Sequence, residues 1–128
     1  RQNYGRGHVQ YVQGDMRDLS GFGDGEFDAA YSAAAMNYIS LEEIGKMAPE
    51  LDRVLKDDGK LYVVVVNKGM FKKEHRRNPE RSARRLKRMY GNPYKAGDVA
   101  EALKGHFKID AMCDGETASK LFARKPEG

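Results

Sequence analysis

The strongest apolar pattern in the chain is an unbroken run at residues 61–66, inside the segment KLYVVVVN. A run that is apolar at both alternate positions is typical of a central parallel strand that is covered on both faces. The run has six residues, whereas a membrane-spanning helix needs roughly 20. The pattern therefore predicts a buried strand over residues 60–67 and no membrane span.

A helical pattern precedes this strand. Ser40 and Glu43 form a capping box, because the serine hydroxyl can accept from the amide of Glu43 while the glutamate side chain reaches back to the serine amide. The helix that follows has apolar residues three or four positions apart: Ile44, Met47, Leu51, Val54 and Leu55. Pro49 lies inside this pattern and lacks a backbone donor, so we expect a kink or two short helices there.

Shorter patterns complete the order of elements. Residues 8–13 and 27–32 are rich in β-formers and predict two short strands. A short helix is expected over residues 96–104, and two final strands over 106–112 and 119–125, with a connection short enough for an antiparallel hairpin. Strands that alternate with helices predict one α/β domain with a mostly parallel sheet and a closing antiparallel hairpin.

The net charge of +4 is unevenly distributed. Residues 68–88 carry ten basic side chains and two acidic ones, a charge of +8, and the remaining 13 basic and 17 acidic side chains sum to −4. Residues 78–80 are a good helix start, and an apolar stripe follows at Ala83, Leu86, Met89 and Tyr90. The basic segment is either a solvated helix face or a surface for polyanions such as nucleic acid, acidic lipid or phosphorylated substrates.

The composition places the chain among globular proteins, with 40% hydrophobic and 33% charged residues. Cys113 is the single cysteine and cannot form an internal disulfide. A reducing, cytoplasmic location is therefore the expectation. We assign no metal ligand and no membrane partner.

Three motifs and one closing segment, four pieces in all, together resemble a known family. The motifs VQGDM at residues 12–16, FDAAYS at 27–32 and LDRVLKDDGKL at 51–61 resemble, in order and spacing, the second half of a class I S-adenosylmethionine-dependent methyltransferase. The segments GHFKI and KLFARKP, which lie between residues 105 and 126, match the last antiparallel hairpin of that family. The resemblance implies a Rossmann-like sheet and S-adenosyl-L-methionine as the cofactor.

The same resemblance implies a set of cofactor-binding residues. An acid at the end of the third strand accepts from the adenine amino group and the next backbone amide donates to the ring, which here would be Asp15 and Met16. A carboxylate suits that place because it is an acceptor when ionised. The loop after the fourth strand implies Ser32, Ala33 and Ala34 beside the methyl donor. Asp15 could instead cap a turn, and the alanines could simply start a helix.

Candidate substrate and catalytic residues follow from the same alignment of elements. Asn37 and Tyr38 stand where the family often contacts its substrate, and Asn67 ends the fifth strand. A base is needed only if the acceptor must lose a proton. The candidates are His75, Tyr38 and Tyr31, of which we favour His75, since it lies in the segment that often covers the substrate in this family. Alternatively, His75 is a surface residue and Tyr38 a packing residue.

Two diagnostic elements of the family are not found. They are the glycine-rich loop after the first strand and the acid that ends the second. Residues 21–25 spell GFGDG but follow a turn and precede a strand, so we interpret them as a surface turn. In the family's sheet, with the order 3-2-1-4-5-7-6, two strands would then be missing between residues 8–13 and 27–32.

We therefore expect residues 1–128 to form a partial methyltransferase domain that lacks its first two strands, with residues 68–91 as a basic insertion or substrate cover. Either the chain is truncated, or a missing N-terminal segment or homodimer partner supplies the strands, or the third strand pairs with the fourth. The expected function is methyl transfer to a small-molecule acceptor, and the basic segment suggests that the acceptor is acidic. We expect this fragment alone to be inactive. Alternatives are an RNA methyltransferase that uses residues 68–88, a non-catalytic binding module and, least favoured, a nicotinamide-binding dehydrogenase.

Overall fold

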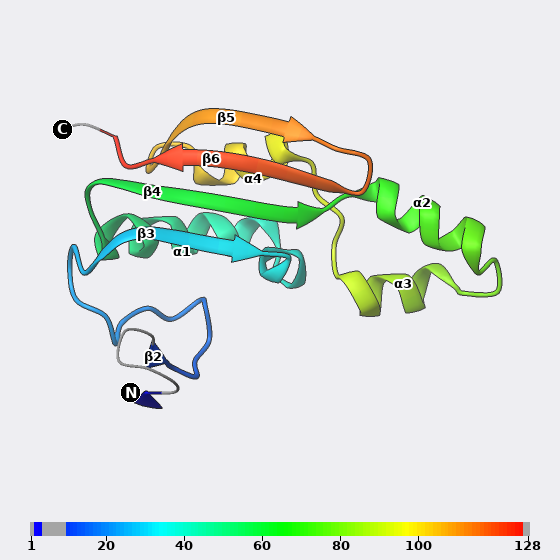
Figure 1. Ribbon diagram of the computed structural model, residues 1–128, viewed down its shortest axis with the longest axis horizontal. Helices are drawn as coiled ribbons and strands as arrows, with labels where there is room; N and C mark the ends of the chain where they lie inside the picture. Colours follow the sequence, from blue (N-terminus) through cyan, green and yellow to red (C-terminus); the bar gives the residue numbers. More distant parts are fainter. Residues whose placement is uncertain (1, 4–9, 127–128) are drawn as a thin grey trace.

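The centre of the molecule is a four-stranded sheet with the order β3-β4-β6-β5 (Figure 1). The computed structural model describes residues 2–3 and 10–126. The strands are β3 (Phe27–Ala33), β4 (Leu55–Val66), β5 (Lys108–Asp114) and β6 (Ala118–Arg124). β3 and β4 run parallel, whereas β4–β6 and β6–β5 are antiparallel.

This arrangement confirms the predicted fold class and its C-terminal hairpin. With β3 and β4 as the fourth and fifth strands of the expected sheet, the observed order equals the 4-5-7-6 part of the predicted order. The described sheet is mixed, since it holds one parallel pair and two antiparallel pairs. The further parallel pairs of a Rossmann-like sheet would lie beyond the outer edge of β3, where the described residues place no strand of the main sheet.

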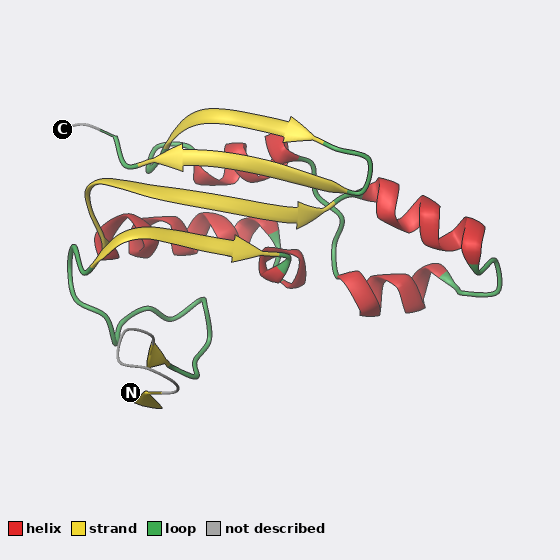
Figure 2. Ribbon diagram, viewed as in Figure 1, coloured by secondary structure: helices red, strands yellow, loops and turns green. Residues whose placement is uncertain are grey.

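Two helices cover one face of the sheet and form the core with it (Figure 2). They are α1 (Leu41–Val54) and α4 (Ala96–Leu103). The alternation along β4 directs Leu61, Val63 and Val65 to this face, where each is at most 2% exposed. Burying a side chain of this size is worth about 1.5–3 kcal/mol. The core therefore holds β4 firmly and fixes the position at which the strand ends.

The opposite face of β4 differs from the sequence-based expectation of a strand covered on both sides. Tyr31, Tyr62 and Phe122 lie side by side across β3, β4 and β6, with ring centroids 4.9 and 4.4 Å apart. Tyr31 is 66% and Phe122 is 47% exposed. The apolar run at residues 61–66 thus packs into the core on one face only. On its other face it contributes to an aromatic ladder that no other described residues cover.

The predicted third strand falls partly outside the described residues, which omit residues 8 and 9. What is described is β2 (Gln10–Tyr11), which pairs antiparallel with β1 (Gln2–Asn3) in a separate two-stranded sheet. β2 therefore does not pair with β3 in the described structure, so the alternative of a third strand beside the fourth is wrong here. The predicted surface turn at residues 21–25 is confirmed, because residues 20–25 form turns and a bend before β3.

Pro49 does not break α1, which is one continuous helix. The proline is exposed, while Met47, Ala48 and Leu51 around it are buried. Tertiary packing therefore holds both halves in one helix despite the lost backbone hydrogen bond. The predicted capping box of Ser40 and Glu43 is confirmed.

The basic segment folds as two helices, α2 (Lys68–Arg77) and α3 (Ala83–Tyr90), and only the second was expected. α3 begins at Ala83 rather than near Pro79, because the side chain of Ser82 accepts from the amide of Arg85 and caps the helix. The α2–α3 hairpin projects beyond the end of the sheet where β4 ends (Figure 1). No helix in the described part of the chain is long and apolar enough to cross a membrane.

Candidate cofactor and acceptor site

The candidate residues gather where β3 and β4 end. Because these strands are parallel, their carboxyl ends lie at the same edge of the sheet, and open α/β sheets bind ligands at that edge. Ser32 and Ala33 end β3, the short 3-10 helix η1 (Ala35–Tyr38) follows at once, and Asn67 follows β4. The structure thus brings most of the predicted site residues to one edge.

Beside the end of β3 lies a cavity of about 260 Å³, here called the Ser32 cavity. Three of the predicted cofactor-binding residues, Met16, Ser32 and Ala33, line it. The rest of its wall is mainly apolar and includes Met47 and Leu51 of α1. The hydroxyl of Ser32 is buried and has no hydrogen-bond partner among the residues that the structure describes. A buried hydroxyl without a partner is costly.

Asp15 directly precedes Met16, and its carboxylate is held by a residue that the sequence analysis did not single out. The guanidinium of Arg17 donates to both carboxylate oxygens, at 2.7–3.2 Å, and the Arg17 amide donates to one of them. These bonds lower the pKa of the Asp15 carboxyl to about 2. Arg17 also donates to Glu43 at 2.7 Å, so it links this turn to the start of α1. The sequence did contain a signal for this ion pair: Asp15 and Arg17 stand two positions apart in the motif GDMRD.

The turn after β3 is strained. Ala34 has a φ of 63° and lies in the left-handed region, which costs an alanine roughly 1–2 kcal/mol. Its amide donates to the carbonyl of Val64, so the turn is tied to β4. Backbone strain of this kind is found preferentially at functional sites. The alternative that the alanines start a helix agrees with the structure in part, because the turn leads into the 3-10 helix η1 rather than an α-helix.

Asn37 lies at the centre of the edge and is fully buried. Its side-chain NH₂ donates to the carbonyls of Val66 and Asn92, and its side-chain oxygen accepts from the Val66 amide. Its backbone carbonyl accepts from the amide of Asn92 at 2.6 Å. Both amide donors are therefore used internally, which gives Asn37 a structural role beside any contact with substrate. Asn92 was not recognised from the sequence.

Tyr38 and His75, the two predicted catalytic residues, are not joined by any recorded contact. Tyr38 is 59% exposed, and its hydroxyl donates to the carbonyl of Met89 at 2.5 Å, which ties η1 to α3. His75 is exposed on α2 and lines neither cavity of this edge. Their catalytic roles stay predictions.

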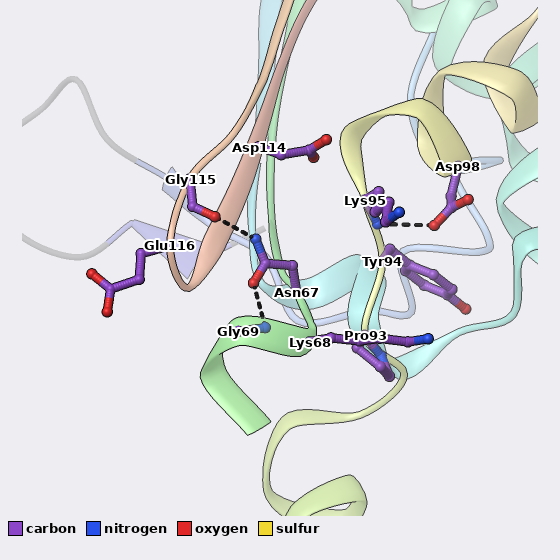
Figure 3. Close-up of a pocket in the computed structure, with 10 residues that line it drawn as sticks. All are labelled: Asn67, Lys68, Gly69, Pro93, Tyr94, Lys95, Asp98, Asp114, Gly115 and Glu116. Atoms are coloured by element: carbon purple, nitrogen blue, oxygen red, sulfur yellow. Dashed lines mark hydrogen bonds between the residues drawn. The ribbon is translucent and has the colours of Figure 1, made fainter. Parts of the chain in front are cut away.

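A second and larger cavity, of about 430 Å³, lies beyond the end of β4 (Figure 3). It is called the Asn67 cavity, and its wall comes from the start of α2, the loop before α4 and the β5–β6 turn. Asn67 accepts from the amide of Gly69 and donates to Gly115 and Ser119. Its side chain thus caps α2 and fixes the turn, and it forms part of the wall.

The Asn67 cavity carries charges of both signs. Its wall includes the basic residues Lys68 and Lys95 and the acidic residues Asp98, Asp114 and Glu116. The pKa of the Asp114 carboxyl is lowered, first by the amide of Ala96 and then by the hydroxyl of Ser119. Among the described residues, no group of three or more His, Cys, Asp or Glu side chains could hold a metal ion.

Comparisons with known proteins agree with this geometry. Residues 1–63 match a family model described as "Methyltransferase domain". No curated protein sequence matches the chain closely enough to count as a relative.

Three solved structures illustrate the likeness in fold. The PH0226 protein from Pyrococcus horikoshii has a TM-score of 0.68 at 20% identity, with 93% of this chain and 60% of that chain covered. Geranyl diphosphate C-methyltransferase from Streptomyces coelicolor gives 0.66 at 14%, covering 93% and 53%. The N-methyltransferase NodS from Bradyrhizobium japonicum gives 0.65 at 16%, covering 95% and 57%.

The fold and the family match together define the class: this chain carries the fold of the class I S-adenosylmethionine-dependent methyltransferases. The resemblance drawn from the four segments is thereby confirmed. The chain spans about 53–60% of the length of these three structures.

Proposed function

We propose that this chain takes part in the transfer of a methyl group from S-adenosyl-L-methionine to a small-molecule acceptor. The observation that carries the proposal is the Ser32 cavity, which joins three residues expected from the family, Met16, Ser32 and Ala33, at the carboxyl edge of a methyltransferase fold. Two of the compared structures, the geranyl diphosphate C-methyltransferase and NodS, were solved with S-adenosylhomocysteine.

The described residues fit one end of the cofactor. The Ser32 cavity, at about 260 Å³, is just below the roughly 300 Å³ at which ligand pockets begin. Its mainly apolar wall suits a flat ring. The Asp15 carboxylate accepts four hydrogen bonds from Arg17. Its side chain is still half exposed, and it would accept from the adenine amino group on that side.

The bound cofactor would supply a sulfonium methyl group, which an acceptor nucleophile takes by in-line displacement. The contribution of this chain is then chiefly to position the two reactants. The η1 turn and the α2–α3 hairpin, tied by Tyr38 to the backbone of Met89, would cover the acceptor. If the acceptor must lose a proton, His75 and Tyr38 remain the candidate bases, and Asn37, Tyr38 and Asn67 the candidate substrate residues.

In the described part of the chain, no glycine-rich loop runs from a strand into a helix. Such a loop would bind the methionine part of the cofactor. We therefore expect the 128-residue chain by itself to bind S-adenosylhomocysteine weakly and to lack transferase activity. The missing groups would come from an N-terminal segment or a homodimer partner. A reducing, cytoplasmic location stays a prediction from the single cysteine, which is exposed.

The test is calorimetry with S-adenosylhomocysteine, on the 128-residue chain and on the longest natural protein that contains it. Ala33→Leu fills space in the wall of the Ser32 cavity, and Ala29→Leu is the matched control on the same strand outside that cavity. We expect Ala33→Leu to weaken binding at least about tenfold, or about 1.4 kcal/mol, and Ala29→Leu to leave it unchanged. No heat with the longer protein would support a non-catalytic binding module instead.

An RNA methyltransferase is the second candidate, favoured by the +8 charge of residues 68–88. The two aromatic side chains of the α2–α3 hairpin argue against base stacking. Phe71 and Tyr90 pack against each other, with ring centroids 6.0 Å apart, rather than forming an open platform. A methylation assay with radiolabelled cofactor on bulk RNA and on a small-molecule extract separates the two acceptors.

A further inference from the structure

The α2–α3 hairpin is a built unit that is firmly attached to the edge of the sheet. Within it, Glu74 is 8% exposed and accepts from Arg81 at 2.9 Å, so an acid of α2 holds the segment that leads into α3. At its base, Gly69 is so close to the β5–β6 turn that an added Cβ would lie 1.7 Å from the carbonyl oxygen of Glu116. The side chains of the hairpin are therefore presented from a defined platform.

Most cations of this platform are free of ion pairs. Of its ten basic residues, Arg77 and Arg81 pair with Glu74. The other eight have no carboxylate within 4.0 Å among the described residues, and all eight are exposed: Lys68, Lys72, Lys73, Arg76, Arg84, Arg85, Lys87 and Arg88. A compact surface of unpaired positive charge attracts an extended polyanion.

The apolar side chains of the hairpin point to the kind of polyanion. Leu86 is 3% exposed, and Phe71 contacts Tyr90 inside the hairpin. Among its described large hydrophobic side chains only Met89, at 38%, is clearly exposed. A helix that lies on a membrane needs an exposed apolar face to insert between lipids. This hairpin uses that face internally, which disfavours a lipid surface.

We infer that the α2–α3 hairpin binds the phosphate backbone of nucleic acid without sequence preference, through its unpaired lysines and arginines. The spread of cations over two helices suits a row of phosphates rather than one buried anion. The absence of an exposed aromatic platform in the described hairpin leaves recognition to charge. The inference is independent of the proposed methyl transfer, since the binding needs neither cofactor nor acceptor.

The test is fluorescence anisotropy of the full 128-residue chain, without cofactor, with a labelled 20-nucleotide RNA and a DNA of the same sequence. For about four contacted phosphates, a single strand should lose roughly 50-fold in affinity between about 50 and 200 mM salt. The variant combines Lys72→Gln, Arg76→Gln, Arg84→Gln and Arg88→Gln, two pairs each four residues apart on one helix face. We expect it to bind at least about tenfold more weakly at low salt and to lose most of the salt dependence.

The matched control removes the same charge from the body of the molecule. It combines Lys60→Gln, Lys104→Gln, Lys108→Gln and Lys120→Gln, all exposed side chains, and should keep most of the affinity. Circular dichroism and thermal melting establish that both variants fold. An equal loss in the control, or no binding to either oligonucleotide, overturns the inference. So does binding only to vesicles of phosphatidylserine and phosphatidylcholine.

Discussion

The side-chain amide of Asn37 and the backbone of Val66 hydrogen-bond to each other in both directions, at 2.9 Å each. At the end of β4, the Asn37 side chain thus makes the two hydrogen bonds that the backbone of a neighbouring strand would otherwise make with Val66. The same amide also donates to the carbonyl of Asn92, 2.8 Å away. One buried side chain thus joins η1, the end of β4 and the segment that follows the basic hairpin.

Replacing Asn37 should therefore destabilise the fold strongly. Asn37→Ala removes three side-chain hydrogen bonds and leaves buried backbone groups without partners, which we expect to cost about 3 kcal/mol in the free energy of unfolding. Urea denaturation measures this loss. Tyr38→Phe is the control from the adjacent position, and should cost about 1 kcal/mol or less, because it removes one bond from an exposed side chain. Equal losses would refute the central role of Asn37.

Two glycines near the same edge should respond in opposite directions to alanine. Gly91 has a φ of 74°, and an added Cβ would lie 2.3 Å from the carbonyl oxygen of Asn37. Gly91→Ala should therefore destabilise by more than about 1 kcal/mol. Gly97 lies inside α4 with open space around its Cβ position. Gly97→Ala should stabilise by about 0.5–1 kcal/mol. Thermal melting of both variants checks the contrast.

The elements of the sheet and α1 could be predicted because their patterns report burial directly. The run at residues 61–66 and the spacing of Ile44, Met47 and Leu51 both mark side chains that the core takes up. α2 was missed because its inward residues are few, with a buried glutamate among them. The local signal was Asn67, whose side chain caps the helix. Pro49 led to the wrong prediction of a kink or a break, because tertiary packing outweighs the local cost of a proline inside the helix.

The site residues could be predicted as positions but not as contacts. Met16, Ser32 and Ala33 line one cavity because the ends of parallel strands meet at one edge. The partners that occupy Asn37 and Asp15 lie 55 and two residues away in sequence. A local sequence pattern cannot show that Asn37 contacts Asn92, because the two residues are 55 positions apart. Arg17 escaped notice because a lone arginine on a turn is most often simply solvated.

The pairing of Asp15 with Arg17 should make part of the stability depend on pH at the acidic end. Hydrogen bonds from Arg17 lower the pKa of the Asp15 carboxyl from 3.8 to about 2. A group with a lowered pKa in the folded state binds fewer protons there than in the unfolded chain. Its contribution to stability is therefore fully present above pH 4 and is lost as the pH falls towards 2.

Arg17→Met tests this assignment. The variant should be less stable than the wild type at pH 6, and the difference should shrink as the pH falls from about 4 to 2. The lowered pKa of Glu43, caused first by the same arginine, adds to the effect in the same direction. Urea denaturation at a series of pH values gives the measurement. Lys46→Met serves as the control, because Lys46 forms an exposed pair with Glu42 alone. A constant difference between wild type and Arg17→Met across this range would refute the prediction.

The open aromatic ladder on β3, β4 and β6 should cause the 128-residue chain to self-associate. Tyr31 and Phe122 are exposed on it, and the outer edge of β3 has no strand partner among the described residues. Exposed apolar patches and free strand edges both favour association. The double variant Tyr31→Lys and Phe122→Lys should shift the chain towards a monomer in light scattering coupled to gel filtration. Met112→Lys, at an exposed position of the opposite edge strand β5, should leave the association unchanged. If Met112→Lys has the larger effect, the copies meet through β5 instead of the aromatic ladder.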